Sequence, residues 1–228
     1  MSVVFPMYNE EAYIHRAVGA ARSTLEELGA DWEIIVVDDA STDRTAELAD
    51  ALAREDPRVR VVHNERNRTL GGTLRRGYAL ATKDLVLYSD ADLPFDFRET
   101  GRAIHLLEFQ QADVLAAYRF DRTSEGLLRT FYTLAYSALV RTLFRLRIRD
   151  INFSFKLFRR SLLGRIELKS EGSFIDAEFL LRARRAGAPI VQMGVDYFPR
   201  VRGVSSLASP AVIAGILREM ARLWRELR

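Results

Sequence analysis

The sequence predicts an α/β protein with a mostly parallel sheet flanked by helices. Short apolar runs alternate with segments of helical periodicity from Ser2 to Ala117, as in repeated strand–helix–strand units. The connections between these runs are short, and polar clusters follow three of the runs. With 228 residues, 48% of them hydrophobic, the chain can form one domain with a full core, and no composition shift marks a second domain.

The expected elements of the first half follow from these patterns. The strands are expected at residues 2–5, 32–37, 59–62, 85–88 and 113–117. The intervening helices are expected at about residues 14–25, 43–54, 71–80 and 97–110. Asn9 is expected to cap the first helix and Gly29 to end it, while Ser41 or Thr42 caps the second. Gly71 and Gly72 would let a backbone approach a ligand closely.

The second half is expected to add a short strand at 155–158, a helix at 174–183, a strand at 190–197 and a basic segment at 200–206. Residues 127–148 are long, aromatic and interrupted mainly by arginines. They predict either a buried core helix or an amphipathic helix at a membrane surface. An apolar stripe from Val212 to Leu227, flanked by arginines, predicts a helix that packs on its own domain, on a second subunit or on lipid.

Composition and charge narrow the class of protein. The chain has no cysteine, which excludes a disulfide framework and fits a reducing compartment. No signal peptide or membrane-spanning run is expected. Residues 1–100 hold 12 Lys and Arg against 19 Asp and Glu, a net −7, whereas residues 101–228 hold 22 against 12, a net +10. This asymmetry favours an anionic partner, but no nucleic-acid motif accompanies it, so a phosphorylated substrate or an anionic membrane is the simpler expectation.

Three clusters that are mainly polar follow three expected strands, where parallel strands would end at one edge of the sheet. They are Pro6, Tyr8 and Glu10, then Asp38 and Asp39, then Asp90 and Asp92. Two carboxylates one residue apart at the tip of a buried strand are costly unless a cation lies between them. Mg²⁺ takes such oxygen ligands together with substrate phosphates. The alternative is a solvated turn. The absence of G-x-G-x-x-G after the first strand counts against NAD or FAD.

Eight sequence blocks resemble a known family. They are FPMYNE, IIVVDDASTDRT, LGGTLRRGYALA, YSDADL, AAYRF, RDINFSFKLFRR, FIDAEFLLRARRAG and RVRGVSSL. Their order and spacing, from Val3 to about Leu207, are similar to those of the polyprenyl-phosphate glycosyltransferases, the dolichol-phosphate mannose and glucose synthases within the family-two inverting glycosyltransferases. The resemblance implies a GT-A fold. Residues 1–120 would bind the nucleotide-sugar, and residues 121–228 would face the acceptor and membrane through amphipathic interface helices.

The resemblance also implies the roles of individual residues. The nucleoside would be held by Pro6, Tyr8, Glu10, Val37 and Asp39, and the metal and diphosphate by Asp90, Ala91 and Asp92. Arg119 would contact phosphate groups, Arg200 would contact the donor, and Arg129 would contact the lipid phosphate. Asp176 and Glu178 would lie near the sugar. Two positions depart from the family pattern: Pro94 stands where many members have Gln, and Ser206 where many have Lys. Arg202 could supply the lost charge toward the acceptor phosphate.

The implied reaction is transfer of a hexosyl group, with inversion, from GDP-mannose or UDP-glucose to a polyprenyl phosphate, with Mg²⁺ or Mn²⁺. An acceptor phosphate is already ionised and needs no strong base, whereas a hydroxyl acceptor would need one, for which Asp176 is the candidate. A soluble or glycan acceptor, and an inactive nucleotide-sugar-binding scaffold, are the alternatives. A cytoplasmic, peripherally membrane-associated enzyme is expected, with a homodimer as a further expectation and no nucleic acid as partner.

Overall fold

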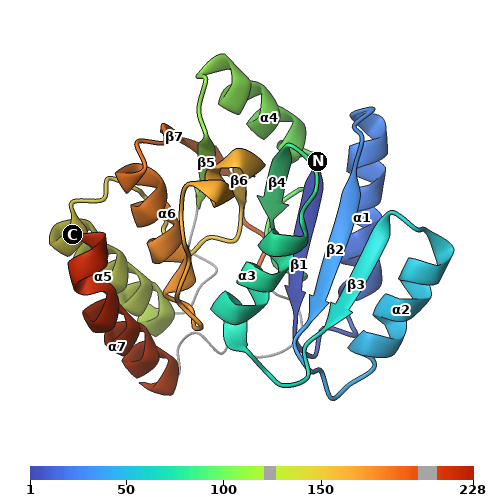
Figure 1. Cartoon of the computed structure of the whole chain (residues 1–228), viewed down its shortest axis with the longest axis horizontal. Helices are drawn as coiled ribbons and strands as arrows, with labels where there is room; N and C mark the ends of the chain where they lie inside the picture. Colours follow the sequence, from blue (N-terminus) through green and yellow to red (C-terminus); the bar gives the residue numbers. More distant parts are fainter. Residues whose placement is uncertain (121–126, 200–209) are drawn as a thin grey trace.

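A computed structural model describes residues 1–120, 127–199 and 210–228, and it describes side chains in these ranges except at 127–134 and 210–211. Strands and helices alternate along most of these ranges (Figure 1). The strands are β1 Ser2–Met7, β2 Glu33–Asp38, β3 Val59–His63, β4 Leu85–Tyr88, β5 Val114–Arg119, β6 Lys156–Arg159 and β7 Ile190–Val195. The helices are α1 Ile14–Glu27, α2 Thr45–Glu55, α3 Thr69–Leu80, α4 Glu99–Phe109, α5 Leu127–Phe144, α6 Ile175–Arg185 and α7 Pro210–Leu227, with a 3₁₀ turn at Arg160–Gly164.

The strands form one seven-stranded sheet in the order β3-β2-β1-β4-β6-β5-β7. All neighbouring pairs are parallel except those of β6, which runs antiparallel to both β4 and β5. The predicted parallel arrangement is therefore confirmed, with one inserted antiparallel strand. The strand order changes direction at β1, because β2 and β3 lie on one side of it and β4 on the other. Ligands of open α/β sheets bind at such a switch point.

The core has two layers, one on each face of the sheet. Alternate residues of β1 divide between them, with Val3 and Phe5 on one face and Val4 on the other, as the two-residue period of a strand requires. Helices α1, α2 and α4 cover the first face. Helices α3, α5, α6 and α7 contribute to the second layer. Both faces are thus protected from water, as expected of a mostly parallel sheet.

The expected helix stop at Gly29 is confirmed, since this glycine has a φ of 60° just after α1. The expected caps are wrong. Asn9 does not cap α1; its Oδ1 accepts hydrogen bonds from the backbone N–H groups of Thr42 at 2.8 Å and Asp43 at 3.3 Å. Asp43, in turn, accepts from the N–H and hydroxyl of Thr45 at the start of α2. The ends of β1 and β2 are adjacent, so Asn9 joins two loops instead of serving its own helix.

The glycines of α3 make a close approach, but to the protein's own backbone. A Cβ added at Gly71 would lie 2.4 Å from the carbonyl oxygen of Ser170. The N–H of Gly72 donates to the carbonyl of Glu171 at 3.0 Å. The expectation that this pair serves a ligand is therefore corrected: it seats the loop before α6 against the start of α3.

Helix α5 ends at Phe144, four residues earlier than expected, and the left-handed φ of 53° at Arg145 follows its end. Figure 1 shows α5 and α7 side by side, and the rings of Phe144 and Trp224 lie 5.0 Å apart. Both helices bury one apolar face in the second layer. Their outer faces expose Leu139, Leu143 and Leu217. No helix in the described ranges combines the length and apolarity needed to cross a membrane.

Candidate active site

The polar clusters that follow β1, β2 and β4 meet at one rim of the sheet, as predicted. The strand register places Met7 opposite Asp38, and Val4 opposite Tyr88. The loops that follow these strands are also bonded to each other, since the N–H of Asp39 donates to the carbonyl of Met7 at 2.8 Å. The switch point therefore carries carboxylates that follow β2 and β4, the two strands on either side of β1.

Asp39 is held in a fixed orientation at this rim. Its Oδ1 accepts hydrogen bonds from Asn64 Nδ2 at 2.6 Å and from the N–H of Arg68 at 2.8 Å. Asn64 is itself bonded by a guanidinium nitrogen of Arg76 at 2.6 Å. The neighbouring Asp38 serves a different partner, because its carboxylate lies 2.9 Å from His63 Nδ1 and raises the pKa of that imidazole. Of Asp38 and Asp39, it is therefore Asp39 whose carboxylate is hydrogen-bonded to the residue just before α3.

The other predicted nucleoside contacts differ in accessibility. Pro6 lies opposite Val37 in the β1–β2 register. The Val37 side chain is fully buried in the second layer, where a Cβ at Gly77 would lie 3.1 Å from it. Any contact of Val37 with a nucleotide would therefore involve its backbone. Tyr8, in contrast, has 48% of its surface exposed at the rim.

The acidic pair follows β4 directly. Asp90 Oδ1 accepts a hydrogen bond from the hydroxyl of Tyr88 at 3.0 Å. Ala91, between the two acids, is buried in the first layer. Downstream, the ring of Phe95 stacks on Phe155 with centroids 4.3 Å apart. The pair therefore sits on a loop anchored at both ends by buried side chains.

The donor set of this loop fits a hard divalent cation in part. Asp90 and Asp92 supply carboxylate oxygens, and no cluster of three or more metal-ligating side chains occurs within the described residues. Mg²⁺ and similar ions are commonly held by one or two carboxylates, with phosphates and waters completing the shell. The carbonyl of Pro94 accepts the N–H of Phe198 at 2.9 Å, so this backbone oxygen bonds the segment after β7.

Arg119, at the end of β5, forms a two-point ion pair with Asp150. Arg119 Nε lies 2.8 Å from Asp150 Oδ2, and Arg119 Nη2 lies 3.1 Å from Asp150 Oδ1. Both side chains are almost wholly buried. The rings of Phe153 and Tyr197 flank the guanidinium at 5.5 and 5.2 Å. Sequence reasoning missed Asp150. The predicted contact of Arg119 with phosphate stays a prediction, and this pairing fixes where the guanidinium lies.

Asp176 lies in the first turn of α6 and pairs with a buried lysine. Lys156 Nζ lies 2.5 Å from Asp176 Oδ1 and donates to the carbonyl of Phe153 at 2.7 Å. Burial raises the pKa of Asp176 to about 6; Lys156 opposes this shift, while the charges of Asp90 and Asp150 add to it. Sequence reasoning missed Lys156. The available signal was a charged residue in an otherwise apolar strand.

Glu178 has a structural role. Its carboxylate is fully buried and accepts hydrogen bonds from the N–H groups of Lys169 and Ser170 at 2.9 and 2.7 Å. Arg182 Nε completes the set at 2.6 Å. These contacts hold the loop that packs on Gly71, so the expectation that Glu178 lies near the sugar is replaced by a role in seating that loop.

Three predicted arginines cannot be placed at the site. Arg200 and Arg202 lie outside the described residues, as does Ser206. Arg129 lies on α5, within the stretch whose side chains are not described. Their assignments to donor and acceptor phosphates stay predictions.

A mostly parallel α/β sheet that is covered on both faces and carries carboxylates at its switch point belongs to the class of open-sheet proteins that bind ligands at the carboxyl ends of their strands. The chain belongs to glycosyl transferase family 2, whose family model matches residues 2–166. It is 34% identical over its full length to the glycosyltransferase AglD of Haloferax volcanii, covering 37% of that protein. It is 28% identical to the dolichyl-phosphate beta-glucosyltransferase of Dictyostelium discoideum, with 86% of this chain and 66% of that protein aligned.

A third relative is the dodecaprenyl-phosphate galacturonate synthase of Rhizobium johnstonii, 28% identical over 90% of this chain and 61% of that protein. The chain thus spans roughly one to two thirds of the length of these curated relatives. Among solved structures, glucosyl-3-phosphoglycerate synthase from Mycobacterium tuberculosis, bound to Mn²⁺ and UDP-glucose, aligns with 96% of this chain and 78% of that one. Its TM-score is 0.71 at 24% identity. This likeness confirms the predicted GT-A fold.

Proposed function

We propose that this protein transfers a hexosyl group from a nucleotide-sugar to a polyprenyl phosphate, with inversion and with a divalent cation. The observation that carries the proposal is the Asp90–Asp92 pair at the switch point, on the same rim as the oriented Asp39. Two of the relatives, a dolichyl-phosphate glucosyltransferase and a dodecaprenyl-phosphate galacturonate synthase, support this acceptor class. GDP-mannose and UDP-glucose are both retained as donors.

In this mechanism the acceptor phosphate oxygen attacks the anomeric carbon while the bond from that carbon to the nucleoside diphosphate breaks. Asp39 and the rim of β1 would orient the nucleoside. Asp90 and Asp92 would hold Mg²⁺ or Mn²⁺, which would offset the charge that develops on the departing diphosphate. Arginines are suited to bring two anionic phosphates together, which is the role proposed for Arg129, Arg200 and Arg202.

The Lys156–Asp176 pair supports an acceptor that arrives already ionised. Lys156 binds one Asp176 oxygen at 2.5 Å, and neither side chain exposes more than 3% of its surface. A carboxylate that is almost wholly buried and paired with an ammonium is poorly placed to take a proton from a hydroxyl, because a substrate does not readily reach it and protonation would weaken the ion pair. A phosphate acceptor is already ionised, so no side chain has to remove a proton from it.

One observation favours a second candidate, transfer to a hydroxyl of a soluble or glycan acceptor. Burial raises the pKa of Asp176 to about 6, which is nearer the range of a working general base. Substitution Asp176→Asn separates the two candidates. A hydroxyl acceptor predicts a loss of roughly 10²–10⁴-fold in turnover, whereas a phosphate acceptor predicts a loss below about tenfold.

The test of the proposed function is transfer of radiolabelled sugar from GDP-mannose or UDP-glucose to a polyprenyl phosphate, with Mg²⁺, Mn²⁺ or EDTA. Label in the organic-extractable lipid supports the proposal, and label in water-soluble product favours the second candidate. Asp92→Asn should abolish transfer. Asp96→Asn is the matched control, because Asp96 is exposed on the same loop and caps the N–H of Arg98. Full activity of Asp92→Asn would contradict the metal role.

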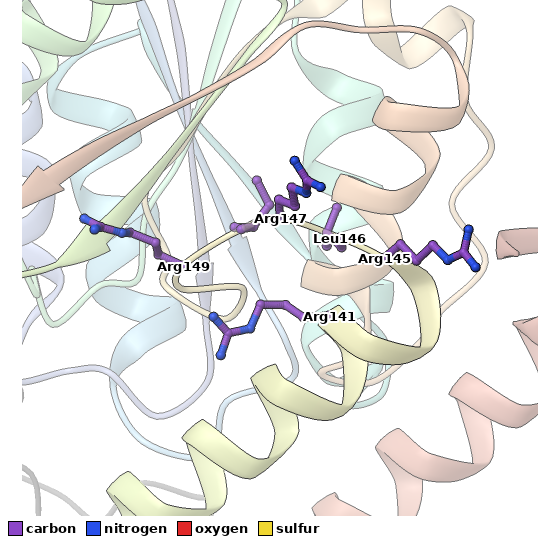
Figure 2. Close-up of a pocket in the computed structure, with 6 residues that line it drawn as sticks. Arg141, Arg145, Leu146, Arg147 and Arg149 are labelled. Atoms are coloured by element: carbon purple, nitrogen blue, oxygen red, sulfur yellow. The ribbon is translucent and has the colours of Figure 1, made fainter.

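The proposal includes peripheral attachment to a membrane through α5 and α7. Arg141, Arg145, Arg147 and Arg149 are exposed around a surface hollow of about 510 Å³. No carboxylate within the described residues pairs with them, and Figure 2 shows their guanidinium groups pointing in different directions. Divergent cations suit a surface with many separate anions better than a single ligand. The exposed leucines of α5 and α7 add apolar contact.

Cosedimentation with liposomes tests this attachment. At low salt the protein should bind vesicles that contain phosphatidylserine, and it should bind vesicles of phosphatidylcholine alone much more weakly. The double variant Arg145→Glu/Arg147→Glu should weaken binding roughly tenfold or more, at about 1 kcal/mol for each charge lost. The control Arg16→Glu/Arg54→Glu alters exposed arginines on the helices of the opposite face. Equal binding of both double variants would contradict the assigned surface.

A further inference from the structure

Tyr88 ends β4 two residues before the first acid of the pair, and the mechanism above does not use it. Its side chain is buried, with 1% of its surface exposed, and its hydroxyl reaches Asp90 Oδ1 at 3.0 Å. Within the described ranges this is the one side-chain hydrogen bond that the Asp90 carboxylate makes. An ionised carboxylate can only accept hydrogen bonds, so in this contact the phenolic O–H of Tyr88 is the donor.

The ring of Tyr88 also contacts the neighbouring strand β6, through Lys156. Tyr88 pairs with Lys156 in the β4–β6 register, and Lys156 Nζ lies 5.5 Å from the ring centroid. The ammonium is fixed by Asp176 and by the carbonyl of Phe153. Two strands and α6 thus define where the hydroxyl lies. A phenylalanine would fill the same volume, so the hydroxyl is the part of this side chain that packing does not require.

We propose that Tyr88 is a positioning residue for the divalent cation: by donating to Oδ1, its hydroxyl holds the Asp90 carboxylate in the orientation in which it ligates the metal. This inference rests on the proposed function, in which Asp90 and Asp92 hold the cation. A carboxylate that is free to rotate must be ordered when the ion binds, and that ordering weakens binding. Outer hydrogen bonds that orient metal ligands typically change metal affinity 10–100-fold.

The experiment measures Mn²⁺ affinity directly, through the paramagnetic resonance signal of free Mn²⁺, on the full chain with UDP or with GDP. Tyr88→Phe should weaken Mn²⁺ binding about tenfold or more. Tyr78→Phe is the matched control. Tyr78 is also buried, packs edge-on against Phe158 at 5.2 Å, and makes no hydrogen bond to Asp90. Its Mn²⁺ affinity should stay within about twofold of wild type.

A second readout separates positioning from a general loss of structure. Affinity for UDP or GDP measured in EDTA should be the same in Tyr88→Phe and wild type, whereas affinity measured with Mn²⁺ should fall. Parallel weakening under both conditions would overturn the proposal, as would unchanged Mn²⁺ affinity in Tyr88→Phe. If Asp92→Asn and Asp90→Asn still bound Mn²⁺ as wild type does, the metal site of the proposed function would be wrong instead.

Discussion

Two buried carboxylates at opposite ends of the sheet have opposite electrostatics. Glu33 begins β2 at the amino end. Its Oε1 accepts hydrogen bonds from the Ser2 hydroxyl at 2.7 Å and from the N–H and hydroxyl of Thr82 at 2.7 and 2.8 Å. Its Oε2 accepts from Arg60 at 2.7 Å. Although burial opposes ionisation, these bonds lower the pKa of Glu33 to about 2.

Asp176 lies near the carboxyl end, where the candidate site is. It pairs with Lys156, and the charges of two nearby acids, Asp90 and Asp150, oppose its ionisation. At the amino end, both carboxylate oxygens of Glu33 accept hydrogen bonds, which favours stability. The carboxyl end keeps several acids close together, which costs stability and suits a rim that receives cations and phosphates.

The largest expected effect is that of Lys156→Met. It leaves Asp176 buried without its counter-ion and should lower the free energy of unfolding by about 3–5 kcal/mol in urea titrations. The double variant Lys156→Met/Asp176→Leu should recover most of this loss, because both buried charges are then absent. A single variant as stable as wild type would mean that Lys156 does not compensate Asp176.

The second largest effect is that of Asp176 on how stability depends on pH. The pKa of Asp176 is about 6 in the folded chain against 3.8 for the free group, so the folded state binds the extra proton between these values. Stability should therefore fall as pH rises from about 4 to 6, by roughly 3 kcal/mol from this group. Asp176→Asn should remove that component from unfolding curves measured across the range.

Glu33 should show the opposite sign. Its pKa is lowered from 4.5 to about 2, so its contribution is present above pH 4.5 and is lost as pH falls toward 2. Glu33→Gln should therefore be less stable than wild type at neutral pH and approach it in acid. Slopes of the same sign for Glu33 and Asp176 would break the contrast between the two ends.

A smaller effect is expected from Gly71→Ala at the carboxyl end. The added Cβ would meet the backbone of Ser170 and Glu171 at 2.4–2.7 Å, and backbone yields less readily than a side chain. The variant should lose about 1–3 kcal/mol of stability and loosen the loop held by Glu178. Faster hydrogen exchange at Lys169 and Ser170 would report the second change.

The smallest effect serves as the control for that variant. Gly19 lies inside α1, and a Cβ added there has no atom within 4 Å. Gly19→Ala should raise stability by about 0.5–1 kcal/mol through helix propensity. Destabilisation by Gly19→Ala would show that alanine itself, and not the contact with Ser170, explains a loss at Gly71.

Local sequence predicted the elements well wherever a pattern was contained within one segment. The expected strand at Leu85–Tyr88 has the observed bounds, because a short apolar run followed by an acidic turn leaves no other boundary. The convergence of the polar clusters followed from parallel strands ending at one edge. The helix caps were wrong because Asn9 bonds a loop more than 30 residues away, which local propensity does not describe.

The sequence by itself determined the alternation of strands and helices, the resemblance to glycosyl transferase family 2 and the acidic pair at a strand end. Only the tertiary structure decided the antiparallel insertion of β6, and with it the position of Lys156 beside Tyr88. That structure also paired Arg119 with Asp150 and Lys156 with Asp176. Apolar periodicity reports burial within one element, whereas the partner of a buried charge depends on which distant element folds against it.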